Sequence, residues 1–157
     1  MKLLLRLTFF VALLGLGACA QSGYLGDAPI NGGAAADPNS VAYFNQTLGD
    51  RVLFAVNENT LSTEAQRILD DQADWMLRNM EYTALIEGHA DEQGTREYNL
   101  ALGERRASAA KRYLVGLGVS SNRLTAISYG KERPAVIGSD ESAWSQNRRS
   151  VTVITDQ

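Results

Sequence analysis

The chain has 157 residues, of which 45% are hydrophobic and 21% are charged. These values are ordinary for a globular protein of about one domain, and they exclude a disordered polymer and a protein with many membrane spans. The formal net charge of −3 argues against a nucleic-acid-binding protein. A single cysteine and a single histidine exclude an internal disulfide framework and a zinc site of several Cys and His ligands, so no metal or cofactor is expected.

Residues 1–18 contain two basic side chains, Lys2 and Arg6, and no acidic one. The apolar stretch that follows the basic residues is shorter than the roughly 20 residues needed to span a bilayer. A basic start with a short apolar stretch is typical of a secretory signal peptide. Its removal leaves 13 basic and 18 acidic residues, so the mature chain has a net charge near −5.

The sequence Leu16-Gly17-Ala18-Cys19 matches the bacterial lipobox, in which an aliphatic residue and two small residues precede a cysteine. The motif predicts cleavage before Cys19, a diacylglycerol on its thiol and an acyl chain on its new amine. Two or more acyl chains give a stable membrane anchor. Because Ala20 follows the cysteine where an Asp would retain a lipoprotein in the inner membrane, we expect the outer membrane. The alternative is a plain signal peptide with an incidental cysteine.

The next segment is rich in Ala and Gly and poor in large apolar residues, so it cannot bury enough surface to offset its ordering entropy. We therefore expect a flexible linker in residues 19–45 and a folded domain in residues 46–157. As a coil, 20–40 would span roughly 25 Å on average, and about 70 Å when extended. Such a tether would let a domain reach away from a membrane, and the alternative is a spacer of no tuned length.

Apolar periodicity within the expected domain predicts two helices and four strands. The predicted elements are a strand at 51–56, a helix at 63–79, a strand at 83–88, a helix at 96–116, and strands at 124–129 and 150–154. The segment between the last two strands is expected to be a loop. This β-α-β-α-β-β order predicts an α+β fold, an α/β sandwich with two main helices packed on a four-stranded mixed sheet.

A carboxylate and two guanidinium groups are the strongest candidates for a binding site. Asp91 follows the second predicted strand, and Arg105 and Arg106 lie in the helix after it. A helix of that length folds one arginine back over the strand end while the other faces solvent. Asp91 and Arg106 would suit a zwitterionic ligand, because Asp binds an ammonium group and Arg binds a carboxylate with two hydrogen bonds. The alternative is that Asp91 and Arg106 pair with each other.

An enzymatic site is a weaker candidate. His89 lies close to Asp91 and Glu92, which is an arrangement suited to general acid–base catalysis. However, no second His or Cys can complete a metal site, and the sequence has neither a GxSxG nucleophile motif nor a GxxxxGK[ST] phosphate loop. We therefore expect a protein that is not an enzyme, with a periplasmic hydrolase as the alternative.

Three segments together resemble a known family. They are GHADEQGTREYNLALGERRA at Gly88–Ala107, SYGKERPAV at Ser128–Val136 and NRR at Asn147–Arg149. They resemble the OmpA-like peptidoglycan-binding domain family, and the resemblance runs from about Arg51 to Ile154. The GHADE, GERRA and SYGKE versions most resemble the lipoproteins of the Tol–Pal system. One departure is Asn57, which stands where close relatives often have an aspartate.

The resemblance implies that Asp91 and Arg106 hold the meso-diaminopimelate of the peptidoglycan stem peptide, while Arg105 is solvated. It also implies residues that line or edge the same groove, namely Phe54, Gly88, His89, Asn99, Leu102, Asn147 and Arg148. The implied protein is anchored in the outer membrane through Cys19, faces the periplasm, and binds peptidoglycan without cleaving it. TolB and other Tol proteins are implied partners in cell division. The alternative is a general peptidoglycan-binding lipoprotein of the family without Tol partners.

Overall fold

The computed structural model describes residues 37–156. The predicted signal peptide, Cys19 and the linker up to residue 36 lie outside the described residues. The elements in chain order are α1 (Val41–Tyr43), η1 (Phe44–Gly49), β1 (Arg51–Leu53), α2 (Thr63–Arg78), β2 (Tyr82–His89), α3 (Arg96–Gly116), η2 (Ser121–Arg123), β3 (Leu124–Gly130), α4 (Glu141–Asn147) and β4 (Arg149–Asp156).

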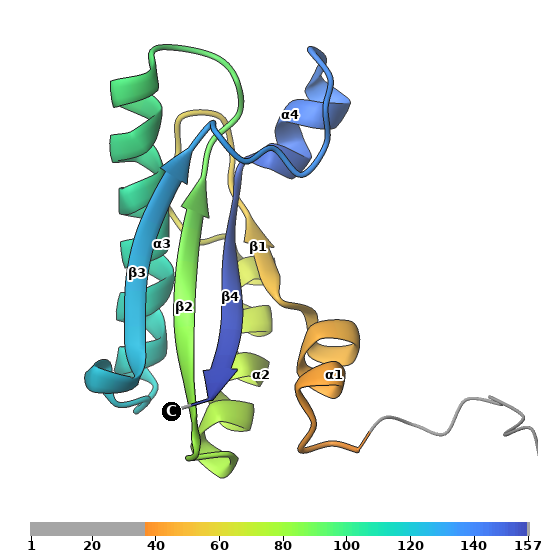
Figure 1. The fold of residues 1–157 in the computed structure, drawn as a ribbon, viewed down its shortest axis with the longest axis vertical. Coiled ribbons are helices and arrows are strands. Elements are labelled where there is room, and N and C mark those ends of the chain that lie inside the picture. The colour runs from red at the N-terminus through yellow and green to blue at the C-terminus, as the bar shows by residue number, and fades with distance from the viewer. Residues whose placement is uncertain (1–36, 157) are drawn as a thin grey trace, which may run out of the picture. The chain divides into compact units, whose positions relative to one another are not determined.

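The four strands form one mixed sheet in the order β1-β4-β2-β3 (Figure 1). The last strand, β4, lies between β1 and β2 and is antiparallel to both, whereas β2 and β3 are parallel and are connected through α3. As a result, one end of the sheet holds the carboxyl ends of β1, β2 and β3 together with the start of β4. This is the α+β fold that the sequence predicts, with two main helices on a four-stranded mixed sheet.

Helices α2 and α3 lie on the same face of the sheet, and the core fills the space between them and the strands (Figure 1). The largest fully buried apolar side chains are Phe44, Val52, Leu69, Trp75, Met76, Ile86, Leu114 and Val119. Within residues 37–156, no helix is both long enough and apolar enough to cross a membrane.

The two long helices begin at side-chain caps that the sequence provides. The hydroxyl of Ser62 accepts a hydrogen bond from the main-chain N–H of Ala65, and Thr95 does the same for Tyr98. Such caps satisfy main-chain N–H groups that have no partner within the first turn. The helices predicted at 63–79 and 96–116 are observed at Thr63–Arg78 and Arg96–Gly116.

Two glycines bring α3 unusually close to the sheet. A Cβ atom added to Gly88 on β2 would lie 1.8 Å from the carbonyl oxygen of Gly103 on α3. A Cβ atom on Gly103 would lie 2.3 Å from the hydroxyl of Ser128. Neither position has room for a side chain. The close approach sets the distance between α3 and the sheet, and so the position of the inward-facing α3 side chains at the end of β2.

The boundary between linker and domain differs from the expectation. Residues 37–45, which the sequence analysis assigns to the flexible linker, are folded against the domain. Phe44 is fully buried and contacts Trp75 edge-on, with ring centroids 5.0 Å apart. The indole N–H of Trp75 donates to the carbonyl oxygen of Pro38 at 2.9 Å. Burial of this aromatic ring, the packing of Val41 and Tyr43 on the core and the long-range hydrogen bond favour the ordering of the segment.

Two further expectations about local structure are wrong. The first strand ends at Leu53 rather than at residue 56, because the chain turns at Asn57, the one non-glycine residue with positive φ in the described range. The segment before β4, which the sequence predicts to be a loop, contains α4. Its start is capped by Asp140, whose carboxylate accepts from the N–H of Ala143 at 2.9 Å.

Candidate functional site

The predicted site residues lie close together at the end of the sheet where β1, β2 and β3 end and β4 begins. Asp91 is the second residue after the end of β2, Arg106 projects from α3, and Arg148 joins α4 to β4. All three are more than 90% excluded from solvent. Three charged side chains from three distant parts of the sequence therefore form a single buried cluster.

Arg106 is completely buried, and each of its three nitrogens donates one hydrogen bond to a main-chain carbonyl. Nε donates to Glu58 at 2.8 Å, Nη1 to His89 at 2.8 Å, and Nη2 to Ala55 at 3.1 Å. These bonds connect the β1–α2 loop to the end of β2. A guanidinium has five N–H groups, so one N–H on each Nη stays available.

The guanidinium of Arg106 keeps its positive charge although it is buried. Burial lowers the pKa of Arg106 to about 10, and the negative charge of Asp91 opposes that shift. At neutral pH the guanidinium therefore stays protonated. Its carbon lies 5.2 Å from the centre of the Phe54 ring, which places the cation over an aromatic face.

The phase of α3 is as predicted, because Arg106 faces inward while Arg105 is exposed. Arg106 lies inside the domain and is completely buried, rather than at the exposed edge of a groove. The chain turns over it at Asn57, and the carbonyls of that turn enclose the guanidinium. Arg106 is thus part of the support of the site as well as a candidate ligand-binding residue.

Asp91 pairs with Arg148 and not with Arg106 in this structure. Arg148 Nη1 lies 3.2 Å from Asp91 Oδ2, and the N–H of Gln93 donates to Asp91 Oδ1 at 3.1 Å. Arg148 also forms an ion pair with Glu141 at the start of α4, and its Nε donates to the carbonyl of Phe54. Hydrogen bonds from Arg148 to Glu141 and Asp91 raise the pKa of Arg148 above its usual range, although burial opposes this.

The remaining predicted residues surround this cluster. Asn99 is buried and donates to the carbonyl of Gln93 at 2.8 Å, which holds the loop after β2. Asn147 accepts from the N–H groups of Ala135 and Val136. The rest are Phe54, Gly88, His89 and Leu102, and all four are buried. Of these four, Phe54 and His89 contact the arginines of the cluster through the Phe54 ring and the main-chain oxygens of both residues.

His89 has its own electrostatic environment. Burial lowers its pKa to about 4, and the positive charges of Arg149 and Arg133 add to that shift. Its Nε2 lies 3.4 Å from a carboxylate oxygen of Glu87, and its ring lies beside Tyr129 with centroids 5.6 Å apart. The ring is therefore neutral near pH 7. It is the main-chain oxygen of His89, not the ring, that contacts Arg106.

Sequence reasoning missed two contributors to the site. One is Glu141, which shares Arg148 with Asp91, and the signal for it was the helix start at Asp140-Glu141. The other is the pair of main-chain carbonyls of Ala55 and Glu58, which no side-chain motif reveals. A cavity of about 160 Å³ is lined by Ala90, Glu92 and Asn147, which are chain neighbours of Asp91 and Arg148.

The arrangement combines opposite charges in a site of low solvent exposure. Asp91 can accept an ammonium group, while Arg106 and Arg148 can bind a carboxylate. Within residues 37–156, no three His, Cys, Asp or Glu side chains come together to hold a metal ion.

The sequence matches a known protein family and several named relatives. The OmpA family profile matches residues 53–148. The peptidoglycan-associated lipoprotein of Mesorhizobium japonicum is 47% identical over 92% of this chain and 88% of its own. That of Rhizobium meliloti is 52% identical over 78% of this chain and 70% of its own.

The fold of this chain is similar to that of solved structures. The crystal structure of the peptidoglycan-associated lipoprotein from Burkholderia pseudomallei has a TM-score of 0.70 and 36% identity, and covers 76% of this chain and 100% of its own. The C-terminal domain of Helicobacter pylori MotB has a TM-score of 0.64 at 17% identity, covers 69% of this chain and 85% of its own, and shares the fold.

Proposed function

The chain belongs to the OmpA family, and on that premise we propose that it is a lipoprotein that binds peptidoglycan without cleaving it. The observation that carries the proposal is the buried cluster of Asp91, Arg106 and Arg148 at the end of β2. The names of the relatives that match most of the chain support the same conclusion.

The proposed ligand group is meso-diaminopimelate of the stem peptide. The far end of this amino acid carries an ammonium and a carboxylate on one carbon. Asp91 accepts the ammonium, and the two remaining N–H groups of Arg106 suit a bidentate carboxylate. Because Asp91 forms an ion pair with Arg148 in this structure, the ammonium must either bind Asp91 alongside Arg148 or displace Arg148 from it.

A pull-down with purified sacculi tests the proposal. The chain should sediment with sacculi, and free meso-diaminopimelate should release it. The exposed neighbour of Arg106 supplies the matched control, since Arg105→Ala should sediment like the parent. Incubation with sacculi should release no soluble fragments. Sedimentation that free diaminopimelate does not affect would place the peptidoglycan contact elsewhere, and released fragments would indicate a hydrolase.

The proposal includes the way the chain is attached. Lipid on Cys19 anchors it in the outer membrane, residues 20–36 act as a tether, and the domain holds the cell wall. Cys19→Ser should abolish incorporation of radiolabelled palmitate, because a hydroxyl cannot form the thioether. Labelled palmitate in that variant would contradict lipidation at Cys19.

The similarity to lipoproteins named peptidoglycan-associated extends the proposal to the Tol–Pal system. The chain would then bind TolB and act in envelope constriction during division. Co-precipitation of TolB with the full chain tests this step separately. A chain that binds sacculi but not TolB would be a general peptidoglycan-binding lipoprotein of the family.

A further inference from the structure

The guanidinium of Arg148 is held in place inside the domain. Its side chain is only 5% exposed, and its Nε donates to the carbonyl of Phe54 at 3.2 Å. The main-chain N–H of Phe54 donates in turn to the carbonyl of Arg148 at 2.9 Å. These contacts join the residue after β1 to the residue before β4. Because they keep the cation buried, Arg148 needs an anion beside it at all times.

Two carboxylates share this cation. Within residues 37–156, the side chains that form ion pairs with Arg148 are Asp91 and Glu141. Nη1 lies 3.2 Å from Asp91 Oδ2 and 3.4 Å from Glu141 Oε2, and Nη2 donates to Glu141 Oε1. Glu141 therefore makes the two-point contact that a carboxylate prefers on a guanidinium, whereas Asp91 makes a single contact. The hydrogen bond to Glu141 is also the largest of the effects that raise the pKa of Arg148.

The two carboxylates differ in their surroundings. The side chain of Asp91 is 10% exposed and that of Glu141 is 64% exposed. Asp91 accepts the N–H of Gln93, and its charge also acts on the buried Arg106. Glu141 lies in the first turn of α4, beyond the end of the sheet where β4 begins (Figure 1). Asp91 is therefore the carboxylate that interacts with both buried arginines, and Glu141 is a second partner for Arg148.

An ammonium group that binds Asp91 brings a third positive charge to that carboxylate, after Arg106 and Arg148. Without a further anion, the ammonium would either be repelled by Arg148 or leave a buried guanidinium unpaired. Glu141 removes this cost, because Arg148 keeps an ion pair whether the ammonium binds alongside it or displaces it from Asp91. With Glu141 included, two carboxylates balance two arginines, so a zwitterionic ligand enters a cluster with no net charge.

We propose that Glu141 is a positioning residue for ligand binding, which keeps Arg148 paired so that Asp91 can accept the ammonium of a zwitterionic ligand. This inference rests on the proposed function, because the ligand group is the one proposed there. Glu141 acts through Arg148 and does not contact the ligand. The short helix α4 therefore sets part of the affinity of the site through one exposed carboxylate.

The opposite role would be competition, in which Glu141 occupies Arg148 in place of the ligand carboxylate. The hydrogen bonds favour the positioning role. Both Nη groups of Arg148 are engaged, whereas Arg106 keeps one N–H available on each Nη. The ligand carboxylate thus has a partner that Glu141 does not occupy. Loss of the charge of Glu141 weakens binding if it positions Arg148 and strengthens binding if it competes.

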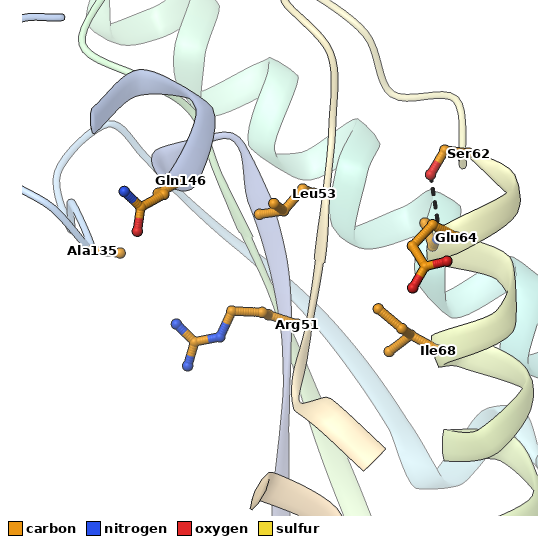
Figure 2. A pocket seen from close by; sticks show the side chains of 8 residues that line it. Arg51, Leu53, Ser62, Glu64, Ile68, Ala135 and Gln146 are labelled. Carbon is orange, nitrogen blue, oxygen red and sulfur yellow. Dashed lines mark hydrogen bonds between the residues drawn. The ribbon is translucent and has the colours of Figure 1, made fainter. Parts of the chain in front are cut away.

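Glu64 on α2 provides a matched control. Like Glu141, it lies in the first turn of its helix and pairs with an arginine, here Arg67 at 3.7 Å. Its side chain is 74% exposed. Figure 2 shows Glu64 and Gln146 of α4 on opposite sides of β1, and both line a cavity of about 380 Å³. Glu64→Gln therefore removes the same charge from a helix start without removing a partner of Arg148.

Calorimetric titration of the full chain in detergent with meso-diaminopimelate tests the proposal. Glu141→Gln should bind at least about fivefold more weakly than the parent, since it breaks a coupled charge network. Glu141→Asp keeps the charge and should recover part of the affinity, whereas Glu64→Gln should bind like the parent. Thermal unfolding of each variant checks that the domain is folded.

Two simpler ligands separate positioning from a general loss of structure. Glu141→Gln should weaken binding of 1,5-diaminopentane, which has only ammonium groups, but not of pimelate, which has only carboxylates. A distorted site would bind both less tightly. Equal or tighter binding of diaminopimelate by Glu141→Gln, or a parallel loss of both simpler ligands, would overturn the role of Glu141. A parent that does not bind diaminopimelate would instead overturn the proposed ligand, and this inference with it.

Discussion

Asp91 and Arg148 form an ion pair of 3.2 Å in which both side chains are almost fully excluded from solvent. A buried pair of this kind costs desolvation energy, and removal of one partner leaves the other charge uncompensated. Arg148 has a second carboxylate partner in Glu141, so the cluster tolerates loss of Asp91 better than loss of Arg148. This asymmetry makes Asp91 the position at which ligand binding and folding can be tested separately.

Asp91→Asn should weaken sacculus binding by at least about tenfold and leave the fold intact. The neutral amide keeps the shape of the side chain but loses a charge-assisted contact to an ammonium, worth about 1.5–3 kcal/mol, and 1.4 kcal/mol corresponds to a factor of ten. Arg148 retains Glu141 and the carbonyl of Phe54. Sedimentation assays measure the binding, and thermal unfolding checks the fold. Unchanged sedimentation would show that Asp91 pairs with Arg148 but does not contact the ligand.

Arg106→Ala should destabilise the domain as well as abolish binding. The change leaves the carbonyls of Ala55, Glu58 and His89 without a donor, which we expect to cost roughly 3 kcal/mol or more. Arg106→Lys should fold better than the alanine variant but bind poorly, because an ammonium cannot form the bidentate contact.

Denaturant unfolding measures the cost, with Arg105→Ala as the exposed control. That control should change stability by less than about 0.5 kcal/mol. Equal stability of the Arg106→Ala variant and the parent would show that the three carbonyl contacts do not support the turn at Asn57.

Gly88→Ala should be strongly destabilising, because its methyl group would lie 1.8 Å from a main-chain oxygen of α3. The helix must move away from the sheet, which also displaces Arg106. The matched control is Gly116→Ala at the end of α3, where an added Cβ meets nothing within 4 Å. That change should be neutral or stabilise by about 0.5–1 kcal/mol, since alanine favours a helix over glycine. Similar melting temperatures for the two variants would contradict the close approach.

Stability should fall as pH decreases from about 6.5 to about 4 because of His89. Its pKa is about 4 in the folded chain against an ordinary value of 6.5, so the unfolded state binds more protons in this range. The free energy of unfolding therefore rises with pH there, by up to about 3 kcal/mol from this group. The difference between parent and His89→Gln in denaturant unfolding at several pH values isolates the effect. Parallel pH profiles for the two proteins would disprove it.

Much of the fold follows from the sequence for identifiable reasons. The bounds of α2 and α3 are predicted because Ser62 and Thr95 are cap residues placed directly before regular apolar periodicity. The phase of α3 also predicts that Arg106 points inward and Arg105 outward. These features depend on local spacing, which a sequence displays directly.

The features that the sequence leaves open depend on long-range contacts. Asp91 and Arg148 are 57 residues apart, and only the placement of β4 between β1 and β2 brings them together. Phe44 follows an Ala- and Gly-rich segment, so its burial becomes visible only when Trp75 and the rest of the core are in place. The enclosure of Arg106 depends on main-chain carbonyls, which carry no residue signature.

The central claim is that Asp91 and Arg106 bind opposite charges of one zwitterionic carbon, and calorimetric titration of the full chain with meso-diaminopimelate tests it most directly. 1,5-Diaminopentane is the matched ligand, since it carries the two ammonium groups of diaminopimelate without the carboxylates. We predict that the parent and Arg105→Ala bind diaminopimelate at least about tenfold more tightly than 1,5-diaminopentane. We also predict that Asp91→Asn loses diaminopimelate binding. Equal affinity of the parent for the two ligands, or unchanged affinity in Asp91→Asn, would contradict the account.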